Sequence, residues 1–425
     1  MEDFRIESLE INKIGAFEHL KMDFPKKTDP DKAEIHILTG ENGTGKTTIL
    51  EMLASCADDS NDIRLYKKFR INNLESVGYS VQVKNHGKKE LYEKHISGIT
   101  PHFKRFQTFE EPEFTYAVSK AFFAYSGNRF AKEELINESS LQLENPFKNA
   151  IDFTKSIDHK QLSIWILSNK THALIANENG DYESKNTYEK NIQKIENIIG
   201  EIIGQEIKFV LQTRPIIHVG VKLDGVQLSI DVLPDGIKSI ISWLGDLVRR
   251  LETMSWIGEP NEVNNIFERN FILFLDEIEV HLHPAWQRKI LPVVQKLFKN
   301  AQIFISTHSP FVVGSVDGAW IHKLKKDGAF AVLDGKPTPS EDAESYETIL
   351  EEVFGIKERF GDEIELKLRE FREITKKILK GKDLRMEEWD NLVSFFENQG
   401  RPDEIMALIT PQVRQIYRIK NQVIA

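Results

Sequence analysis

The sequence predicts an α/β protein built around a mainly parallel sheet, and three observations support this fold class. The apolar run at 35–38 leads directly into a glycine-rich loop and then into an apolar helical pattern. Residues 271–275 (FILFL) and 303–305 (IFI) have the composition of strands that are buried on both faces. A helical pattern separates these two runs, and the order strand, helix, strand implies parallel pairing through a right-handed crossover.

Antiparallel strands and further helices are predicted on either side of this core. Apolar and polar residues alternate over 4–11 and 20–24, which is typical of half-exposed antiparallel strands. Apolar residues recur at helical spacing over 237–251, so this segment should be a strongly amphipathic helix. The helix that follows 271–275 contains Pro292, which should kink or break it.

The segment 56–232 has a less regular pattern. Its strand-like pieces are 79–83, 121–124 and 162–167, and a helix is predicted from about Tyr188 to Ile203. We therefore expect this segment to be a mixed α/β region inserted between two better-defined parts of the chain.

Composition is that of a soluble globular protein. The chain has 425 residues, of which 40% are hydrophobic and 29% are charged. It contains no run of about 18 apolar residues that could span a membrane. The polar, acidic start differs from a signal peptide, and the single Cys56 excludes an intramolecular disulfide, so we expect a cytoplasmic protein.

The net charge of −10 opposes binding of nucleic acid, which would need a local basic patch. Short basic runs occur at 67–70, 104–105 and 376–382. Solvated side chains on loops and helices explain such runs more simply. Nucleic-acid binding is therefore left possible but is unsupported by the charge.

Residues 40–47 (GENGTGKT) match the pattern G-x-x-x-x-G-K-[ST] between a predicted strand and a predicted helix. The glycines let the backbone N–H groups point at phosphate oxygens, where a Cβ would obstruct the approach. We expect Lys46 to reach the β- and γ-phosphates of ATP and the Thr47 hydroxyl to bind Mg²⁺. The predicted nucleotide-binding residues are Gly40, Glu41, Asn42, Gly43, Thr44, Gly45, Lys46, Thr47 and Thr48.

Two acidic residues and a histidine follow the two buried strands. Asp276 and Glu277 come directly after 271–275, at the carboxyl end where ligand sites of parallel sheets form. Given the glycine-rich loop upstream, we expect Asp276 to hold Mg²⁺ and Glu277 to activate the attacking water as general base. His308 follows the next buried strand and is predicted to sense the γ-phosphate; a structural histidine is the alternative. Lys46, Glu277 and His308 are the predicted catalytic residues.

His281 and His283 form a second candidate site, for a metal ion. No third ligand of the right type lies in an obvious position for zinc. A role in an interface or in loop packing is therefore the better interpretation of these two histidines.

Four motifs, in this order, resemble one known family: GENGTGKT (40–47), LPDGIKSIISWLGDL (233–247), FILFLDEIEVHLHPAWQ (271–287) and FISTHSP (304–310). The set is similar to the ABC-type ATPase heads of the SMC, RecF and OLD group, and it covers residues 1 to about 325. It most resembles the compact ATPase subunits of bacterial anti-phage systems, of the Septu and retron-associated types. DEIEVHLHP, FFAYSGNRF and YETILEEVFGIKERF support this narrower likeness.

The resemblance implies that two subunits sandwich ATP, with Mg²⁺, between the glycine-rich loop of one and a signature sequence of the other. Leu233, Asp235 and Gly236 would form this signature, with N–H groups at a helix start facing the partner's γ-phosphate. Pro234 stands where the family usually has serine, so we expect ATP to contribute little to dimerisation. An ordinary helix start capped by Asp235 is the alternative.

Two further residues are assigned by the resemblance alone. Arg129 matches an arginine that is common in the subgroup, and either approaches the nucleotide or the partner or forms a structural ion pair. Gln107 is the positional candidate for the glutamine that bridges Mg²⁺ and the attacking water.

We expect residues 1–55 and 205–335 to form the ATPase head and residues 56–204 to form the inserted region, partly head sheet and partly helical lobe. Residues 336–425 are predicted to be helical and to make oligomer or partner contacts. An apolar stripe should supply much of this association by apolar burial; it consists of Leu368, Phe371, Ile374 and Ile378.

The leading hypothesis is an ATPase, converting ATP and water to ADP and phosphate, that serves as the sensor or regulatory subunit of an anti-phage complex. It would form a homodimer or higher oligomer and control a separate effector such as a nuclease, because the chain shows no nuclease signature. The alternative is a RecF-like DNA-repair ATPase that loads on DNA directly. A transporter ATPase is disfavoured by the unusual signature and by DEIEVHLHP.

Overall fold

The computed structural model divides into two compact units, Met1–Gly355 and Ile356–Ala425, which are described separately. The residues that the structure describes are 4–57, 65, 67–70, 77–85, 87–97, 100–104, 117–118, 121–127, 142–155, 157–212, 214, 217–256, 266–341, 343–380 and 386–424. Among the described helices, none is long and apolar enough to cross a membrane.

A seven-stranded sheet forms the centre of the first unit. Its order is β16-β15-β3-β14-β13-β8, with β17 paired to β15, and the strands from β15 to β8 are all parallel. The sheet therefore aligns the carboxyl ends of β3, β14, β13 and β8 along one edge. Its bounds are β3 Glu34–Gly40, β8 Ala121–Tyr125, β13 Phe271–Leu275, β14 Gln302–Ser306, β15 Trp320–Asp327, β16 Phe330–Leu333 and β17 Thr338–Pro339.

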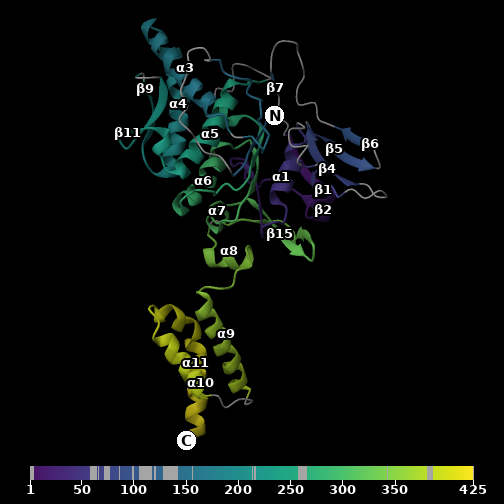
Figure 1. Ribbon diagram of the computed structural model, residues 1–425, viewed down its shortest axis with the longest axis vertical. Helices are drawn as coiled ribbons and strands as arrows, with labels where there is room; N and C mark the ends of the chain where they lie inside the picture. Colours follow the sequence, from purple (N-terminus) through teal and green to yellow (C-terminus); the bar gives the residue numbers. More distant parts are fainter. Residues whose placement is uncertain are drawn as a thin grey trace. The chain divides into compact units, whose positions relative to one another are not determined.

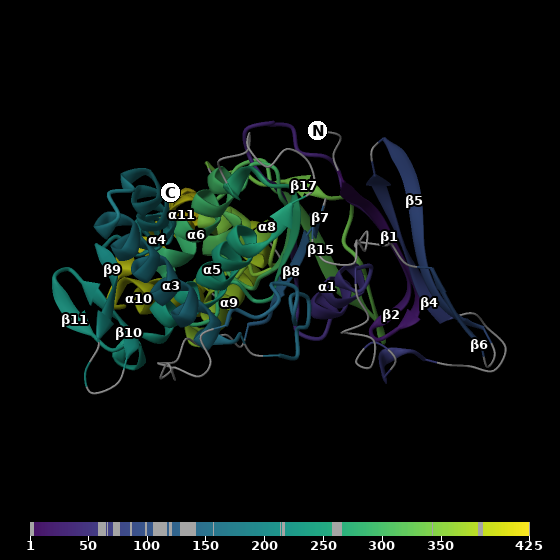
Figure 2. The same ribbon diagram turned by 90° about the horizontal axis from the view of Figure 1, so that it is seen from above.

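Helices and a second sheet cover the two faces of this central sheet (Figures 1 and 2). Successive residues of a strand point to opposite faces, so Leu273 lies in one apolar core and Phe274 in the other. The first core includes residues of α3 to α6, and the second includes residues of α1 and of the antiparallel sheet. The bounds are α1 Lys46–Ala54, α3 His159–Glu178, α4 Tyr182–Ile203, α5 Asp235–Thr253 and α6 Pro284–Leu297.

The antiparallel sheet has the order β2-β1-β4-β5-β6. Its first two strands are joined by a tight turn at Gly15, whose φ is +54°. The bounds are β1 Arg5–Ile14, β2 Phe17–Asp23, β4 Val77–Asn85, β5 Lys88–Ser97 and β6 Thr100–Lys104.

Smaller elements complete the first unit. A three-stranded sheet has the order β11-β10-β9, and β12 pairs with β7. The bounds are β7 Ala117–Val118, β9 Ile207–Gln212, β10 His218–Leu223, β11 Val226–Leu228, β12 Ser255–Trp256, α7 Pro310–Val313, α8 Tyr346–Glu352 and the 3₁₀ turns Ile230–Val232 and Ile266–Glu268.

The predicted fold class is confirmed, because a mainly parallel core sheet, an N-terminal antiparallel part, a mixed inserted region and a helical tail are all present. One predicted strand is wrong: residues 162–167 lie within α3. A short apolar run cannot be distinguished from a buried helical segment by its period. Here the run is apolar because α3 packs against α4 and α5. Pro292 lies inside α6, which continues through it without a break.

The second unit is a bundle of α9 (Asp362–Leu379), α10 (Met386–Glu397) and α11 (Pro402–Ile424). Leu368, Phe371 and Ile374 of the predicted stripe are at most 2% exposed, and the Phe371 ring stacks on Trp389. These side chains are buried within their own unit. This differs from the expectation that the stripe supplies contacts between subunits.

Candidate nucleotide site

The glycine-rich loop runs from the end of β3 to the start of α1, as its sequence predicts. Gly40, Gly43 and Gly45 have φ values of +143°, +82° and +88°, which L side chains rarely adopt. Gly45 is also the residue that precedes the first turn of α1. The loop therefore presents the N–H end of a helix to the hollow beside it.

The reason for glycine differs among the three positions. A Cβ at Gly40 would lie 2.1 Å from the Leu324 carbonyl oxygen, and one at Gly45 would lie 2.5 Å from the Phe17 ring. At Gly43 a Cβ would meet nothing within 4 Å. Contacts inside the chain thus require glycine at 40 and 45. Only at Gly43 does the predicted reason remain, namely that a Cβ would obstruct the approach of phosphate.

Lys46 turns back onto the loop that carries it. Its Nζ donates to the carbonyl oxygens of Gly40 at 2.8 Å and Glu41 at 3.0 Å. Burial lowers the pKa of the Lys46 ammonium, and the nearby Asp276 and Glu277 carboxylates oppose this shift. The ammonium is held at the loop by these two carbonyl contacts, which phosphate oxygens can replace.

Thr47 and Asp276 are brought together across the sheet edge. The Thr47 hydroxyl donates to Asp276 Oδ2 at 2.9 Å. Ser306, at the end of β14, donates to Asp276 Oδ1 at 2.5 Å and accepts the Glu277 N–H at 2.8 Å. A hydroxyl beside a carboxylate is the hard oxygen donor set that Mg²⁺ prefers, so these residues fit the metal.

Glu277 has a strained backbone, with a φ of +48°. Its carboxylate lies against Gly127, where a Cβ would come within 2.7 Å of Glu277 Oε2. The side chain is exposed at the hollow, whereas Asp276 is 7% exposed. Backbone strain of this kind is concentrated at functional sites, and here it falls on the residue that the sequence predicts as the general base.

His308 lies on the same hollow as Lys46, Asp276 and Glu277. Its backbone N–H donates to Glu279 Oε1 at 2.5 Å, which fixes the start of the loop after β14. Burial lowers the pKa of the imidazole, as does the charge of Lys46, while Glu279 and Asp276 oppose them. The imidazole is therefore neutral near pH 7.

The hollow measures about 370 Å³, and four of its lining residues were not predicted as part of the site: Gly15, Ala16, Lys68 and Ser306. The Lys68 ammonium donates to Thr48 Oγ1 at 2.9 Å, and the Gly15 N–H donates to the Lys68 carbonyl at 2.8 Å. Lys68 belongs to the basic run at 67–70, which the sequence alone explains most simply as solvated side chains. Its pairing with the turn after β1 is a long-range contact that no local pattern indicates.

The predicted signature lies at the start of α5, where Leu233 is buried and Pro234 and Asp235 are exposed. Pro234 takes the N-cap position without a side-chain hydrogen bond, and Asp235 forms an ion pair with Lys238 at 3.0 Å. Gly236 is buried, and a Cβ there would lie 2.7 Å from the His281 carbonyl oxygen. Glycine at 236 therefore has a reason inside the chain, besides the predicted clearance for a partner's phosphate.

Of the two histidines, His283 accepts the Ala285 N–H on its Nδ1 at 3.2 Å and caps α6. Gln107 and Arg129 lie outside the described residues.

Two family models match the chain. One is described as "AAA domain" and matches residues 4–56; the other is described as "AAA domain, putative AbiEii toxin, Type IV TA system" and matches residues 103–314. The matched residues contain the glycine-rich loop and the four parallel strands β3, β8, β13 and β14, so this part of the chain is similar to AAA-type domains.

The chain is similar to a retron ATPase and to a Septu protein. The "Retron Ec83 probable ATPase" of Escherichia coli is 30% identical over 208 residues, 47% of this chain and 35% of the relative, so the match spans about a third of that protein. The "Septu protein PtuA" of Bacillus thuringiensis is 22% identical over 311 residues, 72% of each chain. An SMC head bound to the C-winged helix domain of ScpA has a TM-score of 0.46 and 12% identity, covering 79% of this chain and 97% of that chain. The predicted resemblance to retron-associated and Septu ATPases is confirmed.

We expect Lys46→Ala to abolish binding of Mg-ATP, because it removes the cation beside the β- and γ-phosphates. Isothermal titration of the full chain with Mg-ATP measures this. Lys326→Ala is the matched control, since its ammonium lies 3.7 Å from the Glu41 carboxylate and is 53% exposed. Wild-type affinity in Lys46→Ala would contradict the site assignment.

We expect His308 to titrate below 6.5 and its pKa to rise in Lys46→Ala, because the ammonium no longer repels the imidazolium. Since burial and Lys46 depress this pKa, His308 gains its proton only as the pH falls below 6.5. Histidine Cε1–H resonances in NMR spectra measure the shift, with His308→Gln identifying the signal. An unchanged His308 pKa in Lys46→Ala would show that the charge of Lys46 does not act on the imidazole.

Proposed function

We propose that this protein is an ATP-hydrolysing sensor or regulatory subunit of a bacterial anti-phage complex. The observation that carries the proposal is the hydrogen-bonded series from Thr47 through Asp276 to Ser306 and the Glu277 N–H. It joins the glycine-rich loop to the ends of two neighbouring strands. Such a junction is what hydrolysis of a nucleoside triphosphate needs, because it positions phosphate, metal ligands and base together.

Each side chain has one task in this mechanism. Lys46 exchanges its carbonyl contacts for β- and γ-phosphate oxygens, and Thr47 with Asp276 would hold Mg²⁺. The metal, when bound, supplies positive charge that offsets the charge of the phosphates. Glu277 takes a proton from the attacking water as general base. Neutral His308 donates its N–H to the γ-phosphate, which reports whether that phosphate is present.

The second half of the site would come from another copy of the chain. The exposed start of α5 is available to a partner, and the N–H groups of Asp235 and Gly236 precede the first hydrogen bonds within the helix. Such N–H groups attract an anion such as a γ-phosphate. Pro234 contributes neither a hydroxyl nor an N–H to this contact, so dimerisation by ATP should be weak.

The effector is a separate protein of the same defence system, such as a nuclease. The relation to a retron ATPase and to Septu PtuA supports this part of the proposal. Purification with the neighbouring gene products tests it. Recovery of a stable partner supports control of an effector in the cytoplasm, and ATPase stimulation by DNA alone would favour the RecF-like alternative.

We expect Glu277→Gln to bind Mg-ATP but to hydrolyse it about 10²–10⁴-fold more slowly, which is the usual contribution of a general base. The amide keeps the shape of the side chain and loses its basicity. Single-turnover hydrolysis measures the rate, and Glu351→Gln in α8, an exposed glutamate, is the control. An unchanged rate in Glu277→Gln would assign the base to another residue.

We expect Pro234→Ser to strengthen ATP-dependent dimerisation in the Glu277→Gln background. Serine is a favourable N-cap residue, and its hydroxyl and N–H restore two hydrogen-bonding groups at the start of α5. Light scattering with and without Mg-ATP measures the association, with Pro234→Ala as the control that lacks the hydroxyl. The three proteins are Glu277→Gln alone and Glu277→Gln combined with Pro234→Ser or with Pro234→Ala. If all three stay monomeric at saturating ATP, the ATP sandwich between two copies of the chain is refuted.

A further inference from the structure

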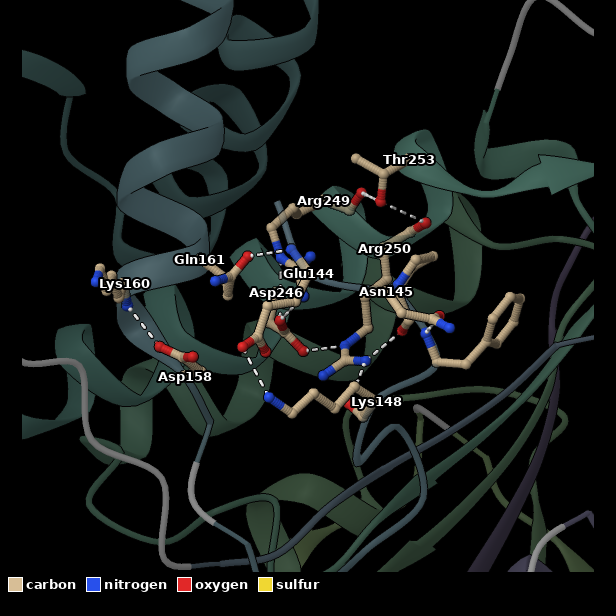
Figure 3. Close-up of polar contacts among 12 residues, drawn as sticks. Glu144, Asn145, Lys148, Asp158, Lys160, Gln161, Asp246, Arg249, Arg250 and Thr253 are labelled. Carbon is tan, nitrogen blue, oxygen red and sulfur yellow. Dashed lines mark hydrogen bonds and ion pairs between the residues drawn. The ribbon is translucent and has the colours of Figure 1, made fainter. Parts of the chain in front are cut away.

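A second cavity lies between the end of β8 and the C-terminal half of α5 and measures about 70 Å³ (Figure 3). It shares no described lining residue with the nucleotide hollow. Three buried charged groups meet there: Asp246 is 1% exposed, Arg249 2% and Arg250 7%. Nothing in the proposed ATPase mechanism uses these side chains.

Two guanidinium groups share the single carboxylate of Asp246. Oδ1 accepts from Arg249 Nη2 at 2.7 Å, while Oδ2 accepts from Arg250 Nε at 2.6 Å and from the Tyr125 hydroxyl at 3.0 Å. Burial raises the pKa of Asp246, but the charges of Arg250 and Arg249 outweigh it and hold the pKa below its usual range. The carboxylate is ionised, so one positive charge remains in excess within this buried cluster.

The other acidic groups that line the cavity have partners of their own, and Lys155 is exposed to solvent. The lining has as many acidic as basic side chains. However, Glu144 pairs with Lys148 at 2.7 Å, and both residues extend towards solvent. Asp152 and Asp158 accept the backbone N–H groups of the residues two positions on, at 2.7 Å and 3.0 Å. None of these acids has a recorded contact with the two arginines.

Arg249 also has an unused donor. Its Nη1 is buried and has no hydrogen-bond partner. A guanidinium nitrogen can only donate, and a buried donor without an acceptor is costly. The cavity beside it exceeds the roughly 10–15 Å³ that a single water needs.

We propose that this cavity binds a small oxyanion, the phosphate or carboxylate group of a ligand, which accepts a hydrogen bond from Arg249 Nη1. Guanidinium groups favour such oxyanions, and one negative charge balances the excess of the cluster. Tyr125 would connect this ligand with the nucleotide site. The Tyr125 hydroxyl contacts Asp246, while its carbonyl accepts the Asp276 N–H at 2.9 Å.

The test uses full-length Lys46→Ala protein, because this substitution should weaken binding of phosphate at the glycine-rich loop. Inorganic phosphate and acetate are titrated separately at constant ionic strength, and the melting temperature is followed. We expect a saturable rise with one of the two anions, which identifies the chemistry, and an affinity at least tenfold weaker with Arg249→Gln added. Arg401→Gln, whose side chain is 84% exposed, is the control and should leave the affinity unchanged. An equal response with and without Arg249→Gln would overturn the proposal.

A second measurement needs no substitution at Arg249 and covers the case in which that variant does not fold. Crystals of the full chain are soaked with selenate and, separately, with bromoacetate, whose anomalous signals locate each anion. A peak within about 3.5 Å of Arg249 Nη1 supports the site. Density for water alone beside this atom in both soaks would overturn it.

Discussion

Three backbone hydrogen bonds continue the parallel ladder past the ends of its strands: Asp276 N donates to Tyr125 O at 2.9 Å, Ile278 N to Ser306 O at 3.4 Å and Thr307 N to Leu38 O at 3.1 Å. They tie together the loops that follow four neighbouring strands. The contacts of Thr47, Asp276, Ser306 and Glu277 depend on this alignment, because a slip of one residue would turn each side chain to the opposite face of the sheet. The apolar strands are thus what holds the polar site in place.

Helix α5 connects this site with the charge cluster behind it. Its first turn carries the candidate signature, and its later turns carry Asp246, Arg249 and Arg250. Fifteen of its 19 residues are buried, and the helix packs against α3 and α4. Tyr125 belongs to both regions, since its hydroxyl contacts Asp246 and its backbone pairs with β13. A ligand in the cavity beside Arg249 would therefore contact β8, the strand that leads to Gly127. Gly127 in turn packs against the Glu277 carboxylate.

How much the sequence predicts depends on the range of the interaction concerned. The glycine-rich loop, the strand at 271–275 and the acidic pair after it are local patterns, and each lies where the sequence indicates. Residues 162–167 were misassigned because a helix buried by its neighbours and a buried strand have the same local composition. Lys68 and Ser306 could not be predicted, since their partners are distant in sequence. In the Asp246 cluster the two arginine contacts are local to α5, and only the contact with Tyr125 is distant in sequence. The need for glycine at 40 likewise has a distant cause, because a Cβ there would clash with Leu324 on the neighbouring strand.

Gly45 and Gly236 show how packing inside the chain and a proposed contact with a partner can fall on the same residue. Gly45 is required by Phe17 and Gly236 by His281 and Trp286, so either residue would be retained by packing alone. A substitution such as Gly236→Arg would disturb the chain itself and would report little about a partner. The exposed neighbours Pro234 and Asp235 are not constrained in this way. Because Leu368, Phe371 and Ile374 of the tail are buried in their own bundle, the exposed start of α5 is the better candidate for the contacts of the proposed dimer.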